Sequence, residues 1–305
     1  MPPTREPGEG DHGWWMRWSC RCAPALNEAQ DAGLLHTWWY IRKTPAWRLR
    51  YQPQDHETTV ADVLLAKLTA NGRIAGWARG IYEPETVAFG GLAAMRIAHD
   101  LFHHDSRHLL ARTAQHSPAP ALGQCETTVL LFSALLRAAG QDWYEQGDVW
   151  AKVLNLRPAT HAVAIGESGT PAQAIRRLMT VNLRSVPGLL PEPWVAAFEA
   201  AGHALADLAH SGGLERGLRA VLAHHFIFHA NRAGLPATDQ ATLAALAVDT
   251  IFTTTERPNS AGHPSGVRRA QPGRTPRLRR RPARPGPPVV PPAREGTPFA
   301  PSNPW

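Results

Sequence analysis

The sequence predicts an α+β fold, in which a small mixed or antiparallel sheet from the N-terminal half packs with a helical C-terminal half. Three segments alternate in polarity with the period of two that is typical of strands: Thr37–Lys43, Trp47–Tyr51 and Ile74–Tyr82. After Gly91, apolar residues recur at helical spacing instead. Strands early in the chain and helices late in it are typical of the α+β class.

The first two strands are predicted to form a hairpin around a turn at Pro45. Side chains two apart on a strand point the same way, so Arg48 and Arg50 share one face of the hairpin. Two guanidiniums on one face are either solvated or hold carboxylates or phosphates with their forked donors. A further alternative is an ion pair with Glu83 or Glu85, at the end of the third predicted strand.

The remaining predicted elements are helices and one loop. The loop, Gln141–Trp150, combines polar and aromatic side chains, and Glu145 and Asp148 make it a candidate site-lining segment. Glu126–Gly140 is the most apolar helix and is expected in the core. The other helices are expected at Pro24–Gly33, Thr58–Ala70, Ala172–Asn182, Trp194–His210, Leu214–Asn231 and Thr238–Ile251, with one more running from Gly91 to His99–His104.

Composition divides the chain into a central domain and two flanking segments. The first 24 residues begin with a polar, Gly- and Pro-rich stretch, and residues 257–305 contain 13 Pro and ten Arg against one acidic residue. Both segments are expected to be disordered or loosely packed around a folded domain at residues 25–256. The net charge of +7 comes from the tail, because the residues before it carry 22 Lys and Arg against 24 Asp and Glu.

Cysteine use and hydropathy indicate in which cellular compartment the protein is expected. Three Cys provide no disulfide framework, which fits a reducing cytoplasm, and no run of 18 apolar residues predicts a membrane helix. The histidine-rich stretch at residues 99–105 has the spacing of no known metal motif. No phosphate-binding Gly loop occurs either, so neither a metal nor an organic cofactor is expected.

Five segments occur in an order that resembles a known family. They are WWYIRK…WRLRY, YEPETVAFGG, AHDLFHHDS, EQGDVW and HHFIFHANRAGL, and they spread over Trp38–Phe252. Together they resemble the thiopeptide-type bacteriocin biosynthesis domain, which is also the C-terminal, glutamate-elimination domain of lantibiotic dehydratases. The size of the chain is similar to that of split dehydratases and of the pyridine synthases of thiopeptide pathways.

The resemblance implies an enzyme that acts on a leader-bearing precursor peptide. A separate glutamylating dehydratase subunit, using glutamyl-tRNA, would esterify a Ser or Thr, and this protein would remove the α-proton and release glutamate. Arg48 and Arg50 match the family's carboxylate-binding strand, and His225 or His229 matches its proton-transferring helix histidine. A homodimer is one expected assembly. The implied substrate-binding residues are Arg42, Glu83, Glu85, Glu145, Asp148, Asn231 and Arg232.

Two departures from the family's pattern leave other functions open. Ala88-Phe89-Gly90-Gly91 stands where elimination proteins usually carry Arg-Tyr-Gly-Gly, so one carboxylate-binding Arg is absent. The histidine placement before Asn231 also differs from the usual His-Met-x-x-Asn-Arg. The alternatives are an aza-[4+2] cycloaddition between two dehydroalanines, as in the pyridine synthases, and a non-catalytic leader-binding subunit.

Overall fold

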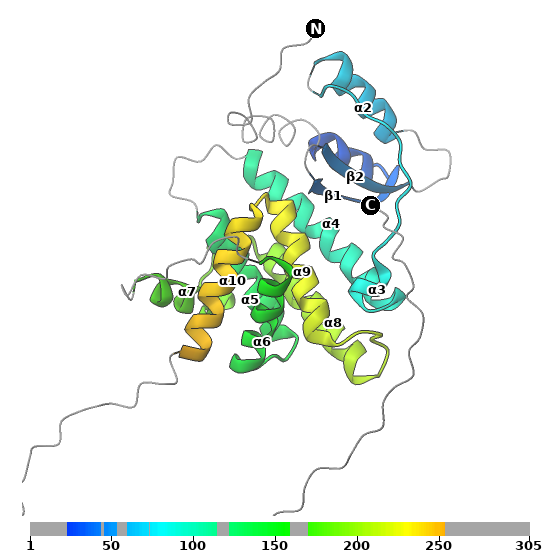
Figure 1. Ribbon diagram of the computed structural model, residues 1–305. Helices are drawn as coiled ribbons and strands as arrows, with labels where there is room; N and C mark the ends of the chain where they lie inside the picture. Colours follow the sequence, from blue (N-terminus) through cyan, green and yellow to red (C-terminus); the bar gives the residue numbers. More distant parts are fainter. Residues whose placement is uncertain are drawn as a thin grey trace, which may run out of the picture. The chain divides into compact units, whose positions relative to one another are not determined.

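The computed structural model describes residues 23–43, 46–53, 60–72, 74–114, 122–158 and 170–253. All of them belong to one compact unit, Met1–Pro258. The segments expected to be disordered, residues 1–24 and 257–305, lie outside the described residues except for residues 23 and 24, which are helical. The predicted α+β class is confirmed, since a two-stranded antiparallel sheet packs with a set of helices (Figure 1).

The predicted hairpin is formed by strands β1 (Leu35–Lys43) and β2 (Ala46–Pro53). Its register places Trp39 opposite Arg50 and Ile41 opposite Arg48. Directly opposite side chains point to the same side of a sheet, so these four residues share one side, which we call the arginine face. The third predicted strand, Ile74–Tyr82, is wrong, because residues 74–85 form neither strand nor helix.

Helix α4 (Leu92–Ala114) occupies the edge of β1 where a third strand would pair (Figure 1). The backbone N–H of Tyr40 donates to Ser106 Oγ at 3.2 Å, and His103 Nδ1 lies 2.8 Å from the Trp38 carbonyl oxygen. Side chains of a helix thus satisfy the strand's outward backbone groups. At Trp38 and Tyr40, α4 therefore takes the place on this edge where the predicted third strand could have paired with β1.

The other helices agree with the prediction to within a few residues, except in three places. Helix α4 runs to Ala114, ten residues beyond the predicted end at His104, and the short helix α3 (Thr86–Phe89) was not predicted. The segment Gln141–Trp150 was predicted to be a loop, but from Trp143 onward it is the first part of helix α6 (Trp143–Leu156). Its start is a capping box, in which the Glu145 N–H donates to Asp142 Oδ1 at 2.8 Å and the Asp142 N–H donates to Glu145 Oε2 at 3.0 Å. The further helices are residues 23–31, α2 (Val60–Ala70), α3 (Thr86–Phe89), α5 (Gln124–Ala138), α6 (Trp143–Leu156), α7 (Thr170–Thr180), α8 (Glu192–His210), α9 (Leu218–Ala233) and α10 (Ala237–Phe252), with a 3₁₀ turn at Leu183–Ser185.

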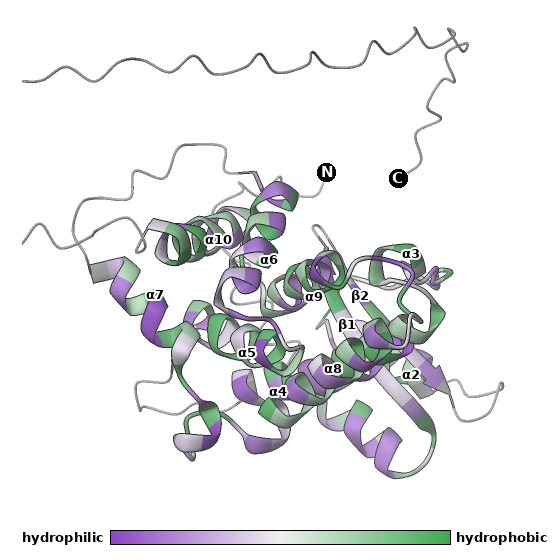
Figure 2. Cartoon of the chain, turned by 90° about the horizontal axis from the view of Figure 1, so that it is seen from below, coloured by the Kyte–Doolittle hydropathy of each residue, from purple (hydrophilic) through white to green (hydrophobic). Residues whose placement is uncertain are grey.

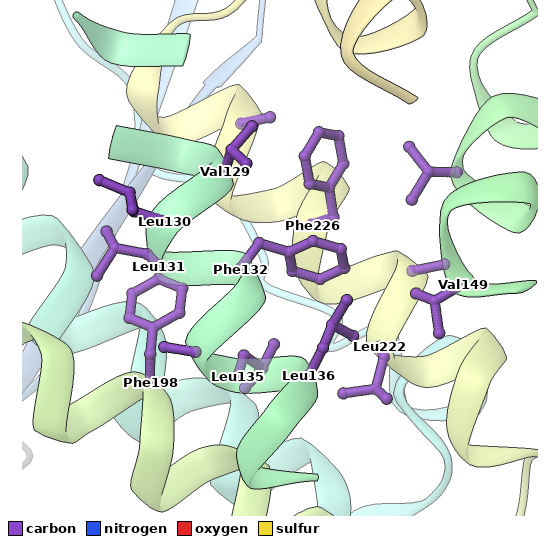
Figure 3. Close-up of a cluster of buried hydrophobic side chains, with 14 of the residues drawn as sticks. Val129, Leu130, Leu131, Phe132, Leu135, Leu136, Val149, Phe198, Leu222 and Phe226 are labelled. Atoms are coloured by element: carbon purple, nitrogen blue, oxygen red, sulfur yellow. The ribbon is translucent and has the colours of Figure 1, made fainter. Parts of the chain in front are cut away.

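The main hydrophobic core surrounds α5, as predicted for the most apolar helix. Phe132 of α5 packs edge-on against Trp150 of α6 and Phe226 of α9, each with ring centroids 5.0 Å apart. Figure 3 shows Phe132 and Phe226 among the buried side chains around α5. Purple and green residues alternate along the helices in Figure 2, as expected for helices that bury one face. A separate small cluster on the arginine face contains Trp39, Phe89, Met95, Ala98 and Phe102, and it positions the site described below.

Candidate functional site

The arginine face carries two guanidiniums that lack an acidic partner. Arg48 is exposed and Arg50 is half-buried, and in the described part of the chain no carboxylate lies within ion-pairing distance of either. Glu83 and Glu85 are exposed and are not ion-paired with them. Burial and the neighbouring Arg48 charge lower the pKa of Arg50. Two adjacent like charges without a counterion favour the binding of an anion.

A hydrogen-bonded pair, Tyr82 and His99, lies beside these arginines. Tyr82 Oη is 2.7 Å from His99 Nε2. The Arg50 guanidinium lies over the Tyr82 ring, 5.0 Å from its centroid, and Trp39 stacks on the His99 ring at 4.7 Å. Since Trp39 and Arg50 are directly opposite in the hairpin, the pair lies against the arginine face.

Burial determines the protonation of this pair at neutral pH. It raises the pKa of Tyr82 to about 12, against the opposing effect of the Arg50 charge. It also lowers the pKa of His99 below its ordinary value of 6.5. At neutral pH the phenol is therefore protonated and the imidazole is neutral, so that one ring nitrogen of His99 can accept a proton.

His225, one of the two predicted proton-transfer residues, is enclosed by aromatic rings. It is 2% exposed, and its ring meets Phe89 edge-on at 5.0 Å and Phe102 at 6.3 Å. Neither ring nitrogen has a hydrogen-bond partner among the described residues. Burial lowers the pKa of His225 to about 3, so the imidazole stays neutral.

His229, the other predicted proton-transfer residue, belongs to a buried polar network. Its Nδ1 is 2.9 Å from Asp105 Oδ2, and its Nε2 is 3.1 Å from Thr128 Oγ1. Asp105 also accepts hydrogen bonds from Arg232 Nε at 2.8 Å and Trp194 Nε1 at 3.0 Å. Burial alone would raise the pKa of Asp105, but His229 and Arg232 hold it at about 2. A cavity of about 150 Å³ borders His229 and Thr128.

Glu145 and Asp148, two of the expected substrate-binding residues, form ion pairs with the same arginine of α9. Both carboxylates bind the guanidinium of Arg219, Asp148 at 2.7 Å. All three side chains are partly exposed, and such surface pairs contribute little to stability. The structure therefore gives these two acids a partner of their own.

Three more expected substrate-binding residues also have their own contacts. Asn231 Oδ1 accepts a hydrogen bond from Gln240 Nε2 at 2.9 Å, and Arg232 is buried against Asp105 as described above. The Arg42 guanidinium lies 4.6 Å from the centroid of Trp47, on the side of the hairpin opposite the arginine face. It also fills the space beside Gly234, which ends α9.

Comparison with known proteins places this arrangement in a family. The family described as lantibiotic biosynthesis dehydratase C-term matches residues 19–251. The chain belongs to this family. The match includes the arginine face, the Tyr82–His99 pair and α9.

Two solved structures share the fold of this lantibiotic dehydratase C-terminal family protein. The tRNA-dependent lantibiotic dehydratase MibB from Microbispora sp. 107891 is 18% identical with a TM-score of 0.53, and the match covers 83% of this chain and 29% of that one. TsrL is 15% identical with a TM-score of 0.56, and the match covers 80% of this chain and 93% of that one. No protein of curated function matches.

Within the described ranges, this family member contains no helix long and apolar enough to cross a membrane. The same residues contain no group of three or more His, Cys, Asp or Glu side chains that could hold a metal ion. The histidines of α4 instead contact different partners. His99 binds Tyr82, His103 binds the β1 backbone and His104 lies 3.9 Å from Asp100.

Arg216 is a cation that sequence reasoning missed, and it binds the backbone of Ala88, which packs against the small cluster on the arginine face. Its Nη1 donates to the Ala88 carbonyl at 2.7 Å and lies 3.4 Å from His224 Nδ1. Ala88 is the position where the elimination proteins that the sequence resembles usually carry Arg. A guanidinium from the segment before α9 is thus placed against that position.

The Tyr82–His99 pair was also missed, although both residues lie in segments that carried the family resemblance. Tyr82 begins YEPETVAFGG, and His99 is the second residue of the AHDLFHHDS segment. Their partnership depends on how residues 74–85 pack on α4, and no local pattern encodes that packing. A tyrosine directly before an acidic, Gly-ending motif was the available signal.

Proposed function

We propose that this protein eliminates glutamate from glutamylated Ser or Thr residues of a leader-bearing precursor peptide, leaving dehydroalanine or dehydrobutyrine. The observation that carries the proposal is the pair Arg48 and Arg50, whose guanidiniums have no acidic partner in the described part of the chain. Guanidinium groups bind carboxylates through two parallel hydrogen bonds. Family membership supports a role in lantibiotic-type peptide modification.

The chemistry of elimination needs fixed cations next to a proton acceptor. The Cα–H bond of the esterified residue breaks and its electrons form the Cα=Cβ bond. The Cβ–O bond then breaks, and its electron pair leaves on the glutamate carboxylate. Arg48 and Arg50 would stabilise the negative charge that develops there. Arg216, held against Ala88, supplies a further cation for the substrate's free carboxylate.

The glutamylated substrate of this reaction is the product of a different step, the esterification of Ser or Thr. The chain spans 29% of the length of the tRNA-dependent dehydratase MibB, whose fold it shares. We propose that a separate dehydratase subunit glutamylates the precursor from glutamyl-tRNA in the cytoplasm. Elimination by the residues named above requires no metal or organic cofactor. Light scattering of the purified protein tests the expected homodimer.

The experiment uses a synthetic peptide with one glutamyl-Ser residue as the substrate. The protein should release glutamate and leave dehydroalanine, both measured by mass spectrometry. Arg48→Ala and Arg50→Ala should lose this activity, whereas Arg177→Ala, which removes an exposed guanidinium from α7, should keep it. A wild-type protein that leaves the glutamyl peptide unchanged contradicts the proposal.

Cycloaddition is the second candidate, and Ala88 is the observation that favours it. A pyridine synthase would not need the carboxylate-binding Arg that this position lacks. Incubation with a peptide that already contains two dehydroalanines tests it, because the cyclised product and the released leader differ in mass from the substrate. Binding of the leader without either product would identify the third candidate, a non-catalytic leader-binding subunit.

A further inference from the structure

We propose that Tyr82 and His99 are the proton-transfer pair of this site, with the Tyr82 hydroxyl removing the substrate α-proton and passing its own proton to His99. The inference rests on the proposed elimination and deepens it by naming the base. It departs from the assignment that the family resemblance implies, which places proton transfer on His225 or His229.

The geometry gives the two residues different roles. Tyr82 is 36% exposed, so its hydroxyl can meet a substrate, whereas His99 is half-buried behind it. The 2.7 Å separation of Tyr82 Oη and His99 Nε2 allows the hydroxyl to donate to the ring nitrogen when Nδ1 carries the imidazole proton. Trp39 stacks on the imidazole and fixes its plane.

Arg50 connects this pair to the predicted leaving-group site. Its guanidinium lies over the Tyr82 ring, so its positive charge favours negative charge on the phenolic oxygen during proton transfer. The same side chain belongs to the face that would hold the glutamate carboxylate. Base and leaving-group cations are therefore adjacent, as an elimination requires.

The other histidines near this face are less suited to the role. His225 and His229 are each 2% exposed. The ring nitrogens of His229 are engaged by Asp105 and Thr128, and those of His225 lie among phenylalanine rings. His103 is bound to the Trp38 carbonyl. Of these histidines, His99 is the one that contacts a side chain of the arginine face and a partly exposed hydroxyl.

The step balances in protons and electrons. The substrate Cα–H proton moves to the Tyr82 oxygen while the Tyr82 proton moves to His99 Nε2, which leaves a neutral phenol and an imidazolium. The two electrons of the C–H bond become the Cα=Cβ bond, and the Cβ–O pair departs with the glutamate carboxylate. The half-buried imidazolium then returns its proton to water.

The charged surroundings of His99 define the pH dependence. From the segment at residues 74–85 it faces Tyr82, and beyond that ring lies Arg50 of β2. Trp39 of β1 does not titrate. On α4 itself, Asp100 lies within 3.9 Å of His104 and His103 binds β1. The reaction needs neutral His99, so its rate should fall as the pH drops through the pKa of His99.

The test measures glutamate release from the glutamyl-Ser peptide by Tyr82→Phe, His99→Gln and the double variant. Each single variant should lose about 10²-fold or more in kcat with little change in KM, which is typical for removal of a general base. The double variant should be no worse than either single one, because the pair acts as a unit. The residual rate of His99→Gln should lack the acid limb of the wild-type pH profile.

Matched controls separate the outcomes. Tyr144→Phe on α6 and His104→Gln on α4 remove the same groups elsewhere and should keep the wild-type rate. Circular dichroism and thermal unfolding establish that each variant is folded, and His99→Asn replaces His99→Gln should the latter unfold. If folded variants of Tyr82 and His99 both keep a near wild-type kcat while Arg48→Ala is inactive, the proton-transfer role of the pair is wrong. The proposed elimination reaction would still hold in that case. A wild type that releases no glutamate would overturn both.

Discussion

Asp105 and His229 join α4 to α9 in the protein interior, with 2.9 Å between Oδ2 and Nδ1. Arg232, one turn further along α9, binds the same carboxylate oxygen at 2.8 Å. All three side chains are at most 2% exposed. The carboxylate thus compensates a buried guanidinium and orients a buried imidazole at once, which makes it the residue on which this region depends.

Asp105→Asn should destabilise the fold by about 3–5 kcal/mol, because it leaves the Arg232 charge buried without a compensating anion. Chemical denaturation measures the loss. Asp100→Asn, one turn earlier on α4 with its side chain 79% exposed, is the matched control and should change stability by less than about 0.5 kcal/mol. Equal stability of the two variants would contradict the role of Asp105.

The same carboxylate should give the protein a defined sensitivity to acid. The pKa of Asp105 is about 2 in the fold and 3.8 ordinarily. Its depressed pKa contributes stability that is fully present above about pH 5 and is lost as the pH falls through 3.8 toward 2, roughly 2–3 kcal/mol in total. Unfolding measured between pH 5 and pH 2 should show this slope in the wild type and a shallower one in Asp105→Asn. Parallel slopes would contradict the prediction.

Gly234→Ala should destabilise the junction between α9 and the hairpin. Gly234 has φ +81°, and a Cβ there would collide with the Arg42 guanidinium. Gly212 has a similar φ of +75° with nothing near its Cβ position, so Gly212→Ala measures the backbone strain alone, about 1 kcal/mol. The excess loss in Gly234→Ala should shrink when Arg42→Ala is added. An equal loss at both glycines would show that the contact with Arg42 is unimportant.

His225→Phe separates the buried histidine from the base assignment. The substitution replaces a buried imidazole without hydrogen-bond partners among the described residues by an apolar ring of similar shape, in a pocket already made by Phe89 and Phe102. Removing an unsatisfied buried polar group should leave the stability unchanged or raise it. Glutamate release should persist if Tyr82 and His99 transfer the proton. A stable but inactive variant would return that role to His225.

The sequence predicted those parts of the fold that are encoded locally. Period-two alternation and a turn at Pro45 were enough for the hairpin and for the shared face of Arg48 and Arg50. The predicted strand at Ile74–Tyr82 does not form, and α4 side chains bind the edge of β1 where it could have paired, which is a long-range arrangement. The prediction of a loop at Gln141–Trp150 was wrong, although Asp142 and Glu145 have the spacing of a capping box, which indicates the start of a helix.

In the candidate site, too, the locally encoded features were predicted and the long-range contacts were not. His225 and His229 were correctly placed on one helix, but their surroundings differ, since α3 and α4 rings enclose one and a buried carboxylate engages the other. Tyr82 and His99 come together only through tertiary packing, 17 residues apart in the chain. Sequence pattern therefore predicted the shared strand face of Arg48 and Arg50 and did not predict the Tyr82–His99 pair beside it.

The reaction of a glutamyl-Ser peptide with wild-type protein and with the Arg48→Ala/Arg50→Ala double variant tests the central claim most directly. Mass spectrometry should show dehydroalanine and free glutamate with the wild type, and intact glutamyl peptide with a double variant whose thermal unfolding is unchanged. Equal dehydroalanine formation by the two proteins, or none by the wild type, would contradict the assignment of the arginine face as the site of glutamate elimination.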